Sequence, residues 1–132
     1  MKKQGSVSDY TSDRNAELCA AFRRCLKESP TFIDLEEIFG KLSRLPASRF
    51  FISEQRASLI IRARRRTGRW PLKNPLRLSM IKEIEARANN LFRSGDYEDF
   101  DDAVFDAVNS PAPSFYLTPR SIRTRIYECL AK

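Results

Sequence analysis

Apolar residues recur along most of this chain at the three- and four-residue spacing of amphipathic helices. Six stretches carry this pattern, and each is bounded by capping residues, glycine, proline or polar turns. We therefore predict an all-α fold of about six helices, joined in places by short extended connectors. The helices are expected over about 13–27, 31–45, 53–68, 80–95, 96–109 and 118–131.

The helix boundaries follow from local chemistry. Ser53 is expected to cap the third helix and Gly68 to end it, because a hydroxyl satisfies free N–H groups and glycine tolerates the left-handed conformation. Thr118 followed by proline is a start signal for the sixth helix. The other expected starts are Asp13, Thr31 with Asp34 at the third position, and Asp96 or Tyr97. Leu35 and Phe105 are expected on buried faces.

The chain contains two similar halves. With an offset of 65 residues, "PASRFFIS" from Pro46 aligns with "PAPSFYLT" from Pro111, and residues 16–67 align without a gap with 81–132. We interpret this as an internal duplication that relates two three-helix halves by an approximate two-fold axis. The expected organisation is a flexible N-terminus at 1–12, a first repeat at 13–68, a basic linker at 69–79 and a second repeat at 80–132.

The repeated motif itself lies between the second and third helix of each half. Proline disfavours helix in the residue before it, and the aromatic pair that follows favours an extended backbone. Two interpretations stay open. The two segments could pair as antiparallel strands, or Phe50 and Phe115 could each plug a three-helix unit.

Charge is distributed unevenly along the chain. The 24 Lys and Arg exceed the 17 Asp and Glu, giving a net charge of +7. The stretch from Arg44 to Arg77 contains ten basic residues and a single acidic residue, Glu54. Residues 94–110 contain six acidic residues and no basic one. The acidic stretch has no calcium-loop spacing and is typical of a solvated helix face, with a DNA-mimicking surface as the alternative.

Arginine dominates the basic stretch, and its planar fork suits phosphate oxygens. The candidate nucleic-acid-binding residues are Arg56, Arg62, Arg65, Arg66, Arg69, Trp70 and Lys73. Other interpretations compete. The arginines could offset the helix dipole, pair with the acidic helix of the second half, or dock an acidic protein. Trp70 is expected to pack the linker onto the body, with base stacking as the alternative.

Catalysis has little support in this sequence. It contains no histidine and no phosphate-binding or nucleophile-elbow motif, so we expect no enzyme activity, no cofactor and no metal site. Cys19, Cys25 and Cys129 are odd in number and lack CxxC spacing, which favours free thiols in a reducing cytoplasm. Neither a secretory signal nor a membrane-spanning stretch is expected.

The motif PAxxF[FY][IL][ST], followed by an Arg-rich helix, resembles one in small proteins of bacterial mobile elements such as prophages and conjugative transposons. The resemblance covers mainly 46–64 and 111–127 and implies a bacterial cytoplasmic regulator, without an established activity. A standard helix-turn-helix is also comparable, but the connector of about 44–53 is longer than its three- or four-residue turn.

We therefore expect a nucleic-acid-binding regulatory protein, with DNA as the first choice of partner. The alternative is a non-enzymatic adaptor that uses the hydrophobic and acidic faces of the second half to bind a protein. Neither hypothesis specifies an oligomeric state.

Overall fold

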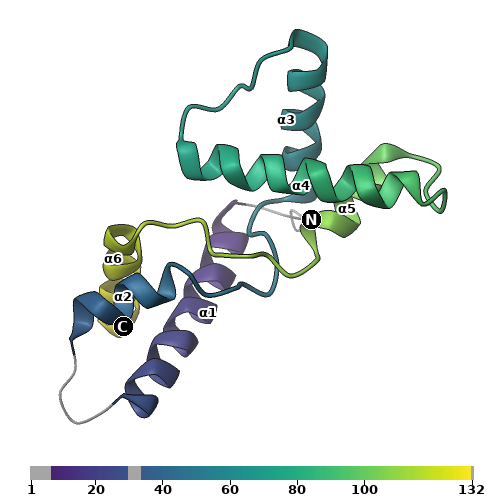
Figure 1. Ribbon diagram of the computed structural model, residues 1–132. Helices are drawn as coiled ribbons and strands as arrows, with labels where there is room; N and C mark the ends of the chain where they lie inside the picture. Colours follow the sequence, from purple (N-terminus) through teal and green to yellow (C-terminus); the bar gives the residue numbers. More distant parts are fainter. Residues whose placement is uncertain (1–6, 30–33, 132) are drawn as a thin grey trace, which may run out of the picture.

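The computed structural model describes residues 7–29 and 34–131, which form six α-helices (Figure 1). The expected all-α fold class is confirmed for these residues, whose only β feature is one isolated bridge. The helices are α1 (Val7–Glu28), α2 (Leu35–Leu42), α3 (Glu54–Thr67), α4 (Pro75–Arg93), α5 (Phe100–Val108) and α6 (Pro119–Leu130).

Several helix ends lie where local chemistry predicted them. The Ser53 hydroxyl accepts a hydrogen bond from the Arg56 N–H and caps α3. Gly68 ends that helix at a φ of 78°, a left-handed conformation that a side chain would disfavour. Thr118 caps α6 in the same way, and Pro119 occupies the first helical position. These termini were predictable because each depends on only a few neighbouring residues.

Other helix starts differ from the prediction. No glycine or proline interrupts 7–28, and α1 begins at Val7 instead of after Asp13. Helix α4 begins five residues earlier than expected, because Asn74 caps it and Pro75 follows, the same start signal as in α6. Asp99, rather than Asp96 or Tyr97, caps α5. Asp34 caps α2, and the expected cap Thr31 lies outside the described residues.

The six helices pack as two groups of three, and neither group is one sequence half. Helix α3 packs against α4 and α5, while α6 packs against α1 and α2 (Figure 1). The third helix of each sequence half therefore packs with the first two helices of the other half. An offset of 65 residues matches α1, α2 and α3 to α4, α5 and α6, so the two groups use equivalent helices. The duplication itself stays a prediction, which superposition of 16–67 on 81–132 tests.

The two repeated motifs meet where the chain passes between these groups. Ala47 and Ala112 form an antiparallel bridge, with N–H to carbonyl distances of 3.0 and 2.9 Å. Both alanines are buried, and their small side chains allow the two backbones to approach. The Phe50 N–H donates to the Val108 carbonyl at 3.1 Å. The connectors thus meet at one isolated bridge and do not pair as strands, and Phe50 is buried where they meet, among helices that are not one sequence half.

The apolar core runs through both groups. Phe50 and Phe115 are 1% and 5% exposed, so the first aromatic of each motif is buried, whereas the second aromatics, Phe51 and Tyr116, are half-buried. Phe105 is instead 53% exposed and Leu35 39% exposed, so their predicted burial was wrong. Phe105 lies outside the buried face of the short helix α5. Smaller side chains make up that face, namely Ala103, Val104, Ala107 and Val108. Across the described residues, none of the helices is long and apolar enough to cross a membrane.

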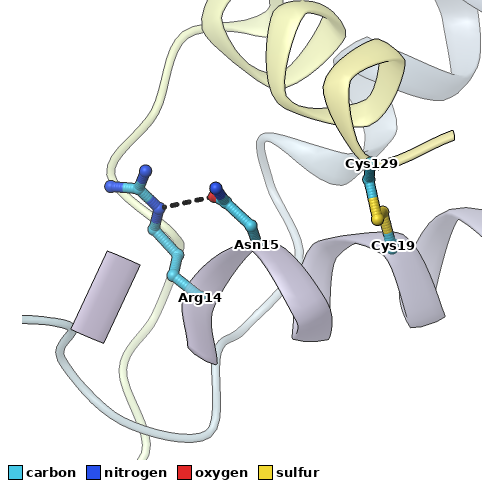
Figure 2. The surroundings of a disulfide bond; sticks show 4 residues. All are labelled: Arg14, Asn15, Cys19 and Cys129. Atoms are coloured by element: carbon cyan, nitrogen blue, oxygen red, sulfur yellow. Dashed lines mark hydrogen bonds between the residues drawn. A yellow bond between two sulfur atoms is a disulfide. The ribbon is translucent and has the colours of Figure 1, made fainter. Parts of the chain in front are cut away.

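The cysteines also differ from the prediction of three free thiols. Cys19 on α1 and Cys129 on α6 form a disulfide (Figure 2), although 110 residues separate them in the sequence. Cys25 is free and buried. The sequence could not show this pairing, because it depends on α6 packing against α1 across the boundary between the two sequence halves.

This disulfide predicts a thiol count. Unfolded, unreduced protein should react with one equivalent of a thiol reagent, at Cys25, and with three after reduction. Folded protein should react slowly, because the Cys25 side chain is buried and its thiolate is hard to reach. Three equivalents from unreduced protein purified under air would contradict the pairing.

Candidate nucleic-acid interface

The seven candidate residues lie on α3 and on the linker that follows it. Helix α3 carries four of them, and residues 68–74, which lead to the first turn of α4, carry the other three (Figure 1). The helix members are Arg56, Arg62, Arg65 and Arg66, and the linker members are Arg69, Trp70 and Lys73. The structure divides this set into residues that bind other parts of the protein and residues that do not.

Arg62 and Arg65 bind within the group of α3, α4 and α5. Arg62 forms an ion pair with Asp101 at the start of α5. Arg65 lies 3.1 Å from a carboxylate oxygen of Glu85 and 2.9 Å from the side-chain oxygen of Asn89, both on α4. Its guanidinium also lies 4.2 Å from the centre of the Phe100 ring. Arg62 thus matches the alternative of pairing with the acidic helix, whereas Arg65 pairs with α4 instead. Because each already has a carboxylate partner, we leave both out of the proposed contacts.

Trp70 is half-buried and packs against the hydrophobic core, as its loop-anchoring interpretation expects. The Arg64 guanidinium lies 5.2 Å from the centre of its indole ring, within range of a cation–π contact. One side of the ring system is therefore occupied by the protein itself. Trp70 holds the linker onto the end of α3 and so positions its neighbours Arg69 and Lys73.

The remaining cations are exposed. Arg56, Arg66, Arg69 and Lys73 form no ion pair with any part of the chain that the structure describes. Three of them follow one another through the last turn of α3 and the linker, in a stretch without a carboxylate. Such an arrangement presents several positive charges to solvent at the same end of one helix group.

Arg56 also borders a second positive region that the candidate set omitted. A cavity of about 360 Å³ lies between α1, α3 and the start of α4, and its lining includes Arg14, Arg56 and Arg77. An adjoining cavity of about 220 Å³ shares Arg14 and Arg77 and adds Arg125 from α6. The sequence held one signal that singles out Arg77. It lies in the first turn of α4, where a cation opposes the helix dipole.

The electrostatics of Arg14 reflect this crowding. Burial lowers the pKa of its guanidinium, and the positive charges of Arg125 and Arg77 lower that pKa further. Arginine nevertheless stays protonated in proteins, so the three side chains repel one another as cations. Sequence reasoning missed this cluster because its members come from α1, α4 and α6.

Comparisons of the chain with protein-family models, with curated proteins and with solved structures found no match. The resemblance to proteins of bacterial mobile elements therefore stays a prediction. Any function proposed for the chain must rest on its own residues and their arrangement.

The different environments of Arg65 and Arg66 predict different stability effects. Arg65→Ala should cost about 1–3 kcal/mol, because it leaves the mostly buried Glu85 carboxylate with a weaker partner. Arg66→Ala should stay within about 0.5 kcal/mol, as is usual for exposed side chains. Urea denaturation of both variants measures this difference. Equal costs would show that Arg65 is as solvated as its neighbour.

Proposed function

We propose that this protein binds nucleic acid, with duplex DNA as the preferred partner, through phosphate contacts of Arg56, Arg66, Arg69 and Lys73. The supporting observation is that these exposed cations lack carboxylate partners in the described structure. An arginine fork binds phosphate oxygens with two hydrogen bonds, and each neutralised phosphate releases counterions. The net charge of +7 adds long-range attraction to a polyanion.

The proposed contacts position the protein on a phosphate backbone and do not by themselves read bases. A helix-turn-helix built from α2 and α3 is not available, because the two helices belong to different packing groups. Residues 43–53, which join the two helices, include Ala47 and so run through the bridge between the two connectors. We therefore expect weak sequence preference and strong salt dependence. A regulatory role in a bacterial mobile element is the biological setting that the resemblance of the repeated motif implies.

Equilibrium binding to a panel of duplex DNA, single-stranded DNA and RNA tests this function. At about 50 mM salt, where electrostatic binding is strong, the wild type should bind duplex DNA, and log K should fall linearly with the logarithm of the salt concentration. Binding to no member of the panel at that salt concentration would overturn the proposal.

One observation favours a second candidate function, the protein-interaction adaptor. Leu59 and Phe105 are 62% and 53% exposed and line the same cavity of about 440 Å³ between α3 and α5. Glu54, Asp101 and Asp102 also line it. This combination suits a partner segment that carries apolar and basic side chains. Failure of the nucleic-acid panel would make this groove the leading candidate.

A further inference from the structure

The cavity of about 220 Å³ between α1, α4 and α6 is lined by three arginines. Arg14 from α1, Arg77 from α4 and Arg125 from α6 line it, and no carboxylate does so within the described structure. Arg14 lies on α1 five residues before Cys19, whose disulfide joins α1 to α6 (Figure 2). The disulfide and the packing of α6 on α1 fix Arg14 and Arg125 relative to each other, and Arg77 lines the same cavity from α4, in the other helix group.

Neighbouring groups satisfy this cluster only in part. The Arg14 Nε donates to the Asn15 side chain at 3.3 Å, and one terminal nitrogen of Arg125 lies 3.1 Å from a Glu128 oxygen. The Arg125 Nε is buried and has no hydrogen-bond acceptor in the described structure. The exposed Arg77 side chain forms no ion pair with the described residues. A buried donor without an acceptor is costly, and so is a set of adjacent like charges.

The rest of the lining provides hydrogen-bonding groups and an apolar wall. Asn74 and Thr118, which cap α4 and α6, face the cavity together with Ser121, so the positive ends of two helix dipoles lie beside it. Phe51 and Phe115 also line it, and their rings are parallel with centres 6.1 Å apart. Small-molecule sites typically combine such an apolar wall with a few convergent polar groups.

We propose that this cavity binds a phosphate monoester that carries a flat apolar group. The phosphate would lie on Arg14, Arg77 and Arg125, and the flat group against Phe51 and Phe115. A monoester dianion compensates more of the three positive charges than a carboxylate does, and its three terminal oxygens match several guanidinium donors. The site does not depend on the nucleic-acid contacts of Arg66, Arg69 and Lys73.

Phenyl phosphate is the test probe, because it has both parts of the proposed ligand. At constant ionic strength kept with NaCl, ~10 mM phenyl phosphate should raise the Tm of the wild type by about 2–5 °C, since a ligand of the folded state stabilises it. Inorganic phosphate should give a smaller shift, and phenol none. No shift beyond that of the NaCl control would overturn the proposal.

Variants separate this site from general attraction to a basic protein. Arg77→Gln should weaken phenyl phosphate binding about tenfold or more in calorimetry, because it removes a charge-assisted contact. Without ligand, this variant should melt no lower than the wild type, because it also removes repulsion in the cluster. The matched control, Arg69→Gln, makes the same charge change outside the cavity and should bind like the wild type. Equal weakening by both variants would overturn the site.

Competition identifies the source of the phosphate. Displacement of phenyl phosphate by a 5′-phosphorylated oligonucleotide, but not by its 5′-hydroxyl form, supports the site with a strand end as its ligand. Displacement by neither supports the site with a small phosphate ester as its ligand. Equal displacement by both forms would overturn the proposal, because internal phosphodiesters would then occupy the cavity. These readouts are independent of whether the panel test of nucleic-acid binding succeeds.

Discussion

The triple variant Arg66→Ala, Arg69→Ala, Lys73→Ala is expected to bind duplex DNA two to three orders of magnitude more weakly than the wild type at ~0.1 M salt. Each lost phosphate contact lowers the slope of log K against log salt by about 0.9, so three contacts lower it by about 2.7. Fluorescence anisotropy across a salt titration measures both quantities. Folding stability should change little, because the three side chains are exposed and unpaired in the described structure.

A matched control distinguishes a defined interface from net charge. The variant Arg23→Ala, Arg24→Ala, Lys27→Ala removes the same three charges from exposed positions on α1, in the other helix group. It should keep most of the wild-type affinity and salt slope. If both triple variants lose affinity equally, binding follows the total charge and the proposed interface is wrong.

Phe50→Ala is expected to destabilise the fold by about 3–5 kcal/mol, the usual cost of deleting a buried aromatic ring. Phe50 is 1% exposed, and its ring centre lies 6.0 Å from that of Tyr116 in the other connector. The Arg87 guanidinium lies 4.9 Å from the centre of the Phe50 ring. The substitution therefore opens a cavity where the two connectors cross and the two helix groups meet.

Urea denaturation followed by far-UV circular dichroism measures this cost. Phe105→Ala is the matched control, since it deletes the same ring from a position that is 53% exposed, and it should cost far less. If Phe50→Ala lowers the free energy of unfolding no more than Phe105→Ala does, packing where the two connectors meet is not central to stability. A Phe115→Ala variant should behave like Phe50→Ala, because Phe115 is buried in the equivalent motif.

Local chemistry in the sequence by itself determined the number and type of helices and several of their ends. Ser53, Gly68 and Thr118 act on backbone groups within a few residues, so their roles do not depend on the rest of the chain. Burial of Phe50 followed from one of the two interpretations of the motif that the sequence left open, because an aromatic ring in a short connector can pack against neighbouring helices. For the candidate site, the sequence identified the basic stretch but not which of its arginines form internal ion pairs.

Only the tertiary structure decided how the parts of the chain combine. The apolar stripe of α3 fits any apolar helix face, so nothing local directs it to α4 and α5 instead of α1 and α2. That choice brings Arg65 to Glu85, while Arg66 one residue later forms no ion pair with the described residues. The equivalent choice by α6 brings Cys129 to Cys19 and Arg125 to Arg14, and Arg77 lines the same cavity from α4 in the other helix group. Whether each arginine is paired or free, and each cysteine bonded or reduced, depends on side chains from distant segments, which helical periodicity does not specify.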